Sequence, residues 1–524
     1  MISNEQNEKT FNGNGRKRIF YSFLIIFIVV NAIFILNIRL LPFIDLPQHL
    51  AYATIYKYIS ESGNVFDQYY EFDSMLFKFN TLHVLFTSLD IWGTVELGNK
   101  IFYILYIILL PVSIFFLIKK LNGNYWLALL SFLFLYNFNV SWGFVVFMMG
   151  IPFCFLVLYF QHEYVTTHSL NSGIKLCILL IIIYHLHLLI AFFITGLVLI
   201  QHIYYNRKSL KNILKRGLVY VPIILLIIYG TIILIFSNGG LEKTTGLKFF
   251  DYYKHEYWYS LKYRAGGFFF LDNFFLFKGI KGILAGFFFS LFTIFSIFWP
   301  FKLKIKLLLS AENKEKKIFA FSIFIYSLLV YFFIVNLGYT CFRFIILVYL
   351  SLIIVGSVLL NNEKLTFLQK VIPIVCILYC FLWYDYFSDF QKENKEFTSS
   401  FFAGIPKDKV LSGLIYEPMY RGKYIYLHFP DYYITWHHGI ETSHIAYGYP
   451  LYRLQRKVSY EVLPRPLVWI GKTKKYNGSC EKVDYLLIKG KYPLHDAENI
   501  NKNFSELRER NNWMLMVNKN LEIN

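Results

Sequence analysis

Long apolar runs separated by short basic segments fill the first three quarters of this chain. Runs of about 17–25 apolar residues have the length of a helix that crosses the hydrocarbon core of a bilayer. The pattern predicts about 11 such helices, at 19–38, 101–118, two within 125–160, two within 174–205, 218–236, 280–299, one ending at 335, one ending at 360, and 371–387. The predicted fold is therefore mainly α, a polytopic transmembrane helical bundle.

Two stretches deviate from this simple alternation. Residues 42–100 are only intermittently apolar, with charged side chains such as Asp67, Glu71, Asp73, Lys78, Asp90 and Glu96 spread through them. This favours helices lying along the membrane surface over a spanning helix. Residues 174–205 are apolar on both sides of "YHLHLL" and are interpreted as a short hairpin with the two histidines at its tip. A single long, tilted helix is the alternative interpretation.

The composition changes abruptly after residue 388, where polar residues with scattered aromatics replace the apolar runs. Stretches such as "KVDYLLIKG" and "GKYIYLHF" alternate in the manner of strands. Three regions follow: a tail at 1–18, a transmembrane domain at 19–388 that includes a first loop at 42–100, and a small mixed α/β domain at 389–524.

The charge pattern sets the expected orientation. The chain is 56% hydrophobic and only 16% charged, with a net charge of +19 and a mean hydropathy of +0.46. Because Lys and Arg concentrate between the apolar runs, as in cytoplasmic loops beside anionic headgroups, the charge does not indicate nucleic-acid binding. Arg16, Lys17 and Arg18 predict a cytoplasmic N-terminus, and about 11 spans then put the C-terminal domain on the outer side. The six cysteines show no framework of paired spacings, so neither disulfides nor a Cys-based metal site is expected.

The stretch "LPFIDLPQHL" carries Asp45 and His49 directly after the first apolar run. A carboxylate at the membrane surface can act as a general base when its pKa lies near the working pH. Asp45 also precedes Pro47 by two positions, as in many helix starts, so it can equally be a helix cap. His49 is one helical turn further on and can orient Asp45, share a divalent ion with it, or be an ordinary interfacial histidine.

Several further polar residues are candidates at the same surface. A lipid phosphate needs cationic partners, and charges near the ends of apolar runs are costly unless they are used or reach the headgroups. The candidates for binding phosphate or substrate are Arg343, Arg264, Lys262, His185 and His187. Weaker candidates are Asp67, Glu71 and Asp73 as metal ligands, Lys78 and His83 in the surface segment, and His437, His438, Glu441 and His444 in "WHHGIETSH", which does not match zinc-protease spacing.

The organisation resembles the C-type glycosyltransferase (GT-C) superfamily of polytopic membrane enzymes. The resemblance is carried by "FIDLPQHL" after the first helix, with weaker similarity in "SWGFVVFMMGIPF", "YHLHLLIAFF" and "CFRFIILVYL". It implies a donor sugar on a polyprenyl phosphate or pyrophosphate and a loop carboxylate beside the site of transfer. Many members carry paired acids at this point, whereas this chain has Asp45 with His49.

The expected function is therefore transfer of a sugar from a polyprenyl-phosphate donor to a glycan, lipid or protein acceptor at the outer face of the membrane. Asp45 and His49 are the expected catalytic residues, and Mg²⁺ or Mn²⁺ is a candidate cofactor. The alternatives are a transporter or flippase of lipid-linked saccharides, in which Asp45, His185 and Arg343 line a path, and a membrane scaffold without enzymatic activity.

Overall fold

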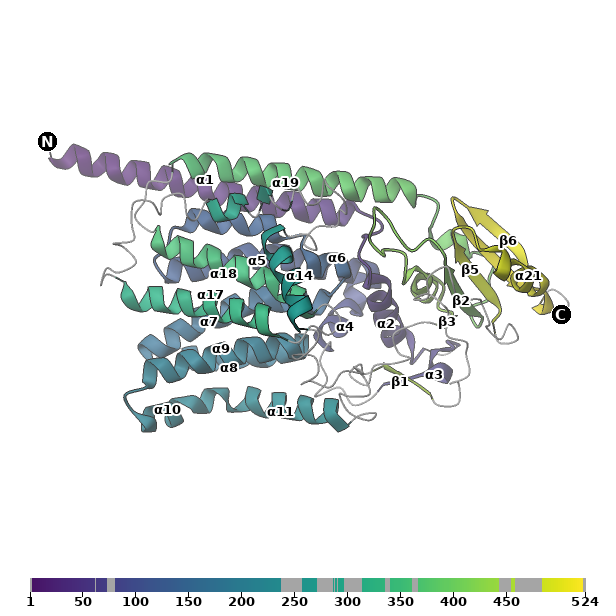
Figure 1. Ribbon diagram of the computed structural model, residues 1–524, viewed down its shortest axis with the longest axis horizontal. Helices are drawn as coiled ribbons and strands as arrows, with labels where there is room; N and C mark the ends of the chain where they lie inside the picture. The colour runs from purple at the N-terminus through teal and green to yellow at the C-terminus, as the bar shows by residue number, and fades with distance from the viewer. Residues whose placement is uncertain are drawn as a thin grey trace.

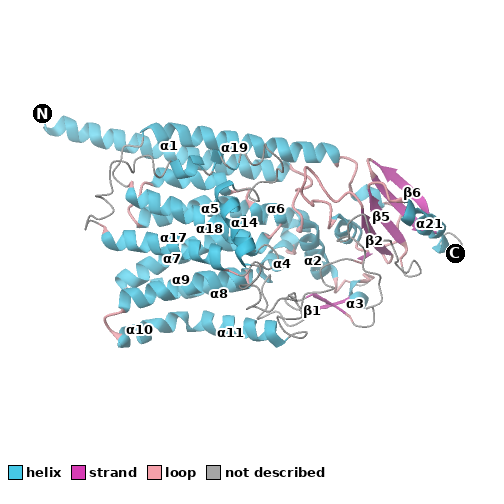
Figure 2. Ribbon diagram, viewed as in Figure 1, coloured by secondary structure: helices cyan, strands magenta, loops and turns pink. Residues whose placement is uncertain are grey.

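The helices of this protein pack into an elongated bundle, and a small β-sheet lies beyond one end of it (Figures 1 and 2). The computed structural model describes residues 2–61, 63–72, 81–236, 257–270, 286, 288–289, 291–295, 313–334, 340–360, 366–442, 454–457 and 483–521. The N-terminus and the C-terminal sheet lie at opposite ends of the long axis (Figure 1).

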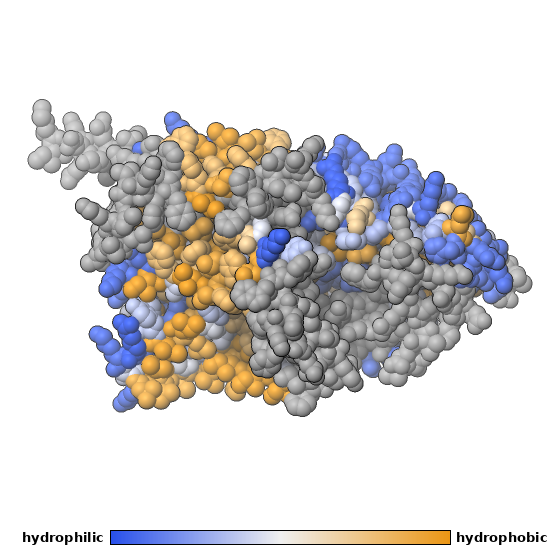
Figure 3. Space-filling view, viewed as in Figure 1, coloured by the Kyte–Doolittle hydropathy of each residue, from blue (hydrophilic) through white to orange (hydrophobic). Residues whose placement is uncertain are grey.

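Within the described residues, eight helical stretches are long and apolar enough to cross a membrane. They are α1 (Ile2–Asn37), α5 (Val95–Lys120), α7 (Val145–Thr167), α9 (Leu188–Asn206), the continuous α10 (Leu210–Gly217), η3 (Leu218–Tyr220) and α11 (Val221–Phe236), α17 (Lys314–Phe333), α18 (Thr340–Leu359) and α19 (Thr366–Glu393). An apolar surface covers much of the bundle, while the C-terminal domain is polar (Figure 3). The helices thus have the length and composition of a multi-pass membrane protein. They do not establish the expected total of about 11, and most of 280–299 lies outside the described residues.

The stretch predicted as a hairpin within 174–205 forms two helices. Helix α8 (Leu170–Leu186) and α9 are separated by one extended residue, His187, with φ −158° and ψ 121°. The two helices lie side by side in Figure 1. The hairpin prediction is therefore confirmed, and the single tilted helix is wrong, because the chain reverses at His187.

The segment after α5 differs from its prediction. Instead of a first α-helix within 125–160, residues Tyr125–Phe134 form a 3₁₀ helix, η2, of which nine of ten side chains are buried. A 3₁₀ helix rises about 2.0 Å per residue against 1.5 Å for an α-helix, so a ten-residue segment can reach further along the bundle. The short α6 (Phe138–Trp142) then turns the chain into α7.

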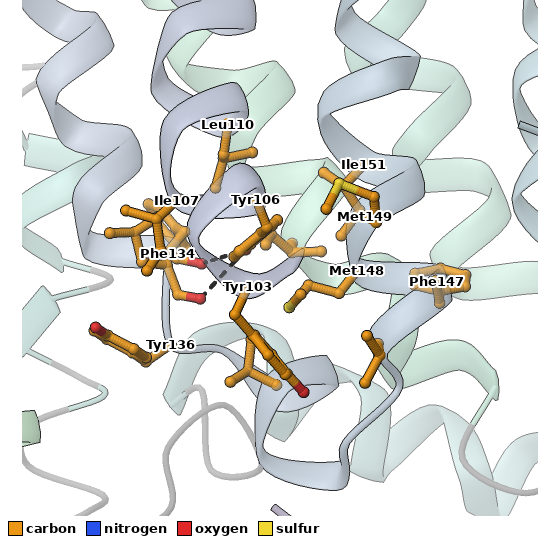
Figure 4. Packing of buried hydrophobic residues seen from close by; sticks show 14 of the residues in the cluster. Tyr103, Tyr106, Ile107, Leu110, Phe134, Tyr136, Phe147, Met148, Met149 and Ile151 are labelled. Atoms are coloured by element: carbon orange, nitrogen blue, oxygen red, sulfur yellow. Dashed lines mark hydrogen bonds between the residues drawn. The ribbon is translucent and has the colours of Figure 1, made fainter. Parts of the chain in front are cut away.

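The turn between η2 and α6 is held by polar groups inside an apolar core (Figure 4). The Tyr106 hydroxyl donates to the Leu135 carbonyl at 3.2 Å. Asn137 Nδ2 donates to the Tyr106 oxygen at 3.0 Å and to the Phe134 carbonyl at 2.9 Å. Because unpaired backbone groups are costly in such surroundings, these bonds explain how a non-α segment is tolerated there.

The loop predicted to lie along the membrane surface contains short helices and no described span. In order they are α2 (Leu46–Tyr58), α3 (Phe66–Tyr69), strand β1 (Tyr70–Phe72), α4 (Thr81–Thr87) and η1 (Asp90–Trp92). Strand β1 pairs antiparallel with β4 (Leu454–Arg456), so the first loop and the C-terminal region share a two-stranded sheet. Helix α2 lies between the bundle and the C-terminal domain (Figure 1).

The C-terminal region contains a mixed five-stranded sheet in the order β3-β2-β5-β7-β6. Its strands are β2 (Val410–Ile415), β3 (Ile440–Glu441), β5 (Tyr485–Lys489), β6 (Phe504–Arg510) and β7 (Trp513–Asn518), joined by η6 (Ser399–Phe402), η7 (Phe429–Asp431), α20 (Tyr432–His437), α21 (Leu494–Asn503) and the final η11 (Lys519–Leu521). The β2–β3 and β2–β5 pairs are parallel, whereas β5–β7 and β6–β7 are antiparallel.

One of the two strand predictions in this domain is correct. "KVDYLLIKG" contains β5, but "GKYIYLHF" forms turns. In that segment Ile425, Tyr426, Leu427 and His428 are all buried, so its side chains do not alternate between a core face and a solvent face. A buried coil and a half-buried strand share this composition.

Candidate functional site

Asp45 directly precedes α2, at the end of the bundle that faces the C-terminal domain. It occupies the N-cap position, but its side chain makes no capping hydrogen bond. Its backbone N–H instead donates to the Trp142 carbonyl at 2.9 Å, and the N–H of Ile44 donates to the Ser141 carbonyl at 3.2 Å. The α6 turn therefore fixes the backbone of Asp45, while the carboxylate is left for other contacts.

Gly143 makes this close approach possible. It adopts φ +79°, and a Cβ at this position would lie 2.9 Å from the backbone N of Leu46 and 3.0 Å from that of Asp45. Both the left-handed backbone and the lack of space require glycine here. The "SWG" stretch thus has a local reason to pack against "FIDLP".

The carboxylate of Asp45 faces a histidine of the C-terminal domain. His428 Nε2 lies 3.6 Å from Asp45 Oδ1, and Gln48 Nε2 lies 2.7 Å from His428 Nδ1. Since the Gln48 amide nitrogen donates to Nδ1, the imidazole proton is on Nε2 and points toward Asp45. Asp45 and Gln48, at the two ends of the first turn of α2, therefore both lie against His428, which directly precedes η7. These three residues form the Asp45 group.

Arg343 of α18 is the cationic neighbour of this group. Its guanidinium lies 3.6 Å from the centre of the Phe144 ring, and its carbonyl accepts a hydrogen bond from Asn139 Nδ2 at 3.1 Å. Burial raises the pKa of Asp45 to about 7, and the charge of Arg343 acts in the opposite direction. Of the Asp45 side chain, 22% remains exposed, so the carboxylate is largely desolvated but still accessible.

Two further side chains, those of Tyr103 and His187, lie near Asp45 or Arg343. Tyr103 of α5 is within electrostatic range of Asp45, and its buried hydroxyl has no hydrogen-bond partner among the described residues. His187 is within electrostatic range of Arg343, and its Nδ1 accepts from the Leu189 N–H at 3.2 Å. Burial, assisted by Arg343, lowers the pKa of His187 to about 3, so the ring is neutral at pH 7.

His49 contacts a histidine of α4. Its ring packs edge-on against His83 of α4, with ring centroids 5.6 Å apart. His83 Nε2 lies 3.0 Å from Asn99 Oδ1, and burial lowers the pKa of His83 to about 4. His49 is thus part of the packing between α2 and α4, and the imidazole that faces Asp45 is His428.

The remaining residues predicted to bind phosphate or substrate are Arg264, Lys262 and His185. Arg264 of α14 (Tyr257–Phe270) is fully buried and donates to the carbonyls of Tyr331, Phe332 and Ile334 at 3.1, 2.6 and 2.7 Å. These bonds satisfy the C-terminal carbonyls of α17. Lys262 is exposed on α14, and His185 is half-buried in the last turn of α8.

The weaker metal candidates are dispersed. Asp67 and Glu71 are exposed, while Asp73, Lys78 and His444 lie outside the described residues. His437 stacks on Tyr433, His438 packs against Tyr58, and Glu441 is buried near Asp431. No group of three or more His, Cys, Asp or Glu side chains gathers in the described part of the chain.

The chemistry around Asp45 does not fit a divalent cation well. A single carboxylate with a guanidinium nearby supplies few oxygen ligands for Mg²⁺ or Mn²⁺. The imidazole that faces Asp45 presents its N–H and not a lone pair, because Gln48 donates to the other ring nitrogen. The group is better arranged for proton transfer and for holding an anion.

Sequence reasoning missed His428 and Gln48. Gln48 is in the quoted motif but was not singled out, and His428 lies in the stretch interpreted as a strand. Gln48 and His428 are 380 residues apart in the chain, and nothing local indicates the pairing.

The comparisons with known proteins give no identification. No family model and no curated protein matches this sequence.

Proposed function

We propose that this protein is a membrane glycosyltransferase that moves a sugar from a polyprenyl-phosphate donor to an acceptor hydroxyl at the outer face of the cell inner membrane. The observation that carries the proposal is the Asp45 carboxylate, free of capping bonds, with a raised pKa and with Arg343 nearby. A desolvated base beside a cation, at one end of an apolar bundle, suits the reaction of a lipid phosphate.

Each residue has a role in the proposed step. Asp45 accepts the proton of the acceptor hydroxyl as its oxygen attacks the anomeric carbon of the donor. The bond between that carbon and the phosphate oxygen breaks, and its electron pair leaves with the phosphate. Arg343 compensates the negative charge that develops on the phosphate. His428 and Gln48 orient the carboxylate, and the proton on Asp45 afterwards passes to water or to the phosphate.

The proposed orientation follows from the charge pattern. Helix α1 begins, and the basic helix α10 lies, at the end of the bundle away from the sheet (Figure 1). Arg16, Lys17 and Arg18 belong to the first half of α1. With this end in the cytoplasm, as the excess of Lys and Arg predicts, Asp45 and the C-terminal domain are external. The apolar helices then hold the lipid tail of the donor.

The test compares Asp45→Asn with wild type. Transfer of a labelled sugar from the lipid-linked pool is measured in membranes, after the donor and acceptor have been identified by comparing lipid-linked sugars and surface glycans with and without the protein. We expect a loss of about 10²–10⁴-fold, the usual contribution of a general base. Full activity of Asp45→Asn would contradict the assignment.

The matched control is Asp90→Asn. Asp90 is in the same loop, with 94% of its side chain exposed, and its ion pair with Lys57 is a surface contact of small energetic value. The Asp90→Asn variant should transfer sugar at the wild-type rate. If Asp45→Asn stopped the movement of lipid-linked saccharides across the membrane but left sugar transfer from donor supplied at the outer face unchanged, the transporter alternative would replace the enzyme. Such proteins place their site near the middle of the bundle, whereas Asp45 is at one end.

A further inference from the structure

A cavity lies along α2, beyond the Asp45 group. It has a volume of about 370 Å³, in the lower part of the range of small-molecule pockets. Thr54 is nine residues after Asp45, so about 14 Å of helix separates the two. The cavity lies between α2, the start of α5, and the η6 and α20 segments of the C-terminal domain.

The lining carries many hydroxyl groups and several rings. The hydroxyl residues are Thr54, Thr94, Thr398, Ser399 and Thr435, and the rings are Tyr58, Trp436 and His438. A hydroxyl that donates to a backbone carbonyl keeps lone pairs for a ligand, as Thr54 does by donating to the Leu50 carbonyl at 2.9 Å. Hydroxyl groups beside aromatic rings match a molecule that carries both hydroxyl and C–H groups.

The charged groups of the cavity are already engaged. Arg39 donates to the carbonyls of Phe397 and Asn394 at 2.5 Å each, and Glu96 accepts from Trp436 Nε1 at 2.5 Å. Burial lowers the pKa of His438 to about 4, so this ring is neutral at pH 7. With one cation, one anion and a neutral imidazole, the cavity has no net charge to attract a phosphate or a carboxylate.

His438 has an unusual backbone for its residue type. It ends α20 in the left-handed conformation, with φ 62° and ψ 26°, where glycine is the ordinary residue. Its ring lies against Tyr58 at 4.3 Å between centroids.

We propose that this cavity binds a neutral saccharide, a mono- or disaccharide unit, at a site separate from Asp45. Its place in the reaction, as the site for the acceptor glycan, rests on the proposed function; the binding itself does not. The same two segments, α2 and 428–438, build the Asp45 group at one end and the cavity at the other.

The test measures binding to the full chain in lipid nanodiscs, because sugar-based detergents would compete. Cellobiose, maltose, mannobiose and N,N′-diacetylchitobiose are titrated by calorimetry, with glucose 6-phosphate as the charged comparison. We expect saturable binding of at least one neutral disaccharide and weaker binding of the phosphate. Failure of all four to bind, or a preference for the phosphate, would overturn the proposal.

The decisive variant is His438→Gly, which removes the ring and suits the left-handed backbone. Affinity should fall at least tenfold while the thermal midpoint stays equal or rises, so loss of binding cannot be assigned to misfolding. The matched control is His168→Gly, at φ 58° and ψ 24° at the end of α7, which should bind as wild type does. Wild-type affinity in His438→Gly would contradict the site.

Two more variants refine the result. Thr54→Val removes one lining hydroxyl at constant shape and should weaken binding severalfold; unchanged affinity would remove Thr54 from the site. Asp45→Asn should bind the disaccharide as wild type does, even where transfer is lost. A fully active Asp45→Asn would therefore sink the proposed reaction and leave the binding result standing, whereas absent binding would sink the cavity alone.

Discussion

At the N-terminal end of α2, Asp45 is in a desolvated setting with a guanidinium nearby and an imidazole N–H facing it. At the other end of the same helix, Thr54 and Tyr58 line a cavity whose charged groups are engaged, Arg39 by backbone carbonyls and Glu96 by Trp436. Both ends face the same C-terminal segment. On the proposed function, one interface separates reactivity from recognition: burial raises the basicity of a carboxylate at one end, and the lack of net charge at the other end leaves shape and hydroxyls to select the ligand.

The largest effect that should distinguish the two ends comes from Arg343→Met. Loss of a positioned cation typically costs about 10²–10³-fold in rate, so transfer should fall by that factor. Disaccharide binding should be unaffected. Arg343→Lys keeps the charge and should retain more activity than the Met variant. Equal loss of transfer and binding would show that the two ends are not separate.

Gly143→Ala should act on the Asp45 end alone. A left-handed alanine costs about 1–2 kcal/mol, and the new Cβ would press on the backbone of Asp45 and Leu46. We expect transfer to fall about 10–100-fold, measured at saturating donor. Gly404→Ala is the matched control, because Gly404 has φ +86° and open space around its Cβ position. If Gly143→Ala and Gly404→Ala lowered transfer equally, the close contact of Gly143 with the backbone of Asp45 would have no effect on the reaction.

The smallest expected effect is a difference in pH dependence between the two ends of α2. The base must be ionised, so kcat/KM should rise about tenfold per pH unit below about 7 and level off above it. Saccharide binding should stay constant between about pH 5.5 and about pH 8, because the pKa of His438 is lowered to about 4. A flat rate profile would contradict Asp45 as the base.

The bundle was predictable where composition and length decide the structure. Apolar runs marked the long helices, and the two histidines in "YHLHLL" marked the reversal between α8 and α9. The 3₁₀ helix η2 could not be predicted, because its apolar sequence is equally suited to an α-helix. Its conformation depends on how far the chain must reach and on the Tyr106 and Asn137 bonds.

The site was predictable only in part. Asp45 stood out because a carboxylate directly after an apolar run is unusual, and Arg343 because a charge within one is costly. The pairing of Asp45 with His428 depends on how the last quarter of the chain packs on α2, which no local pattern encodes. Arg264 shows that a charge in an apolar context can have a structural role, because its guanidinium donates to the carbonyls at the end of α17.

The antiparallel pairing of β1 with β4 has a consequence for biosynthesis. Ribosomes release Tyr70 long before Arg456, so the early loop must wait, unpaired, while the intervening helices enter the bilayer. His428 reaches Asp45 only after those insertions are finished. Nascent chains that stall or are cleaved before this point would carry the Asp45 carboxylate without the His428 imidazole, and on the proposed function they would lack a complete site.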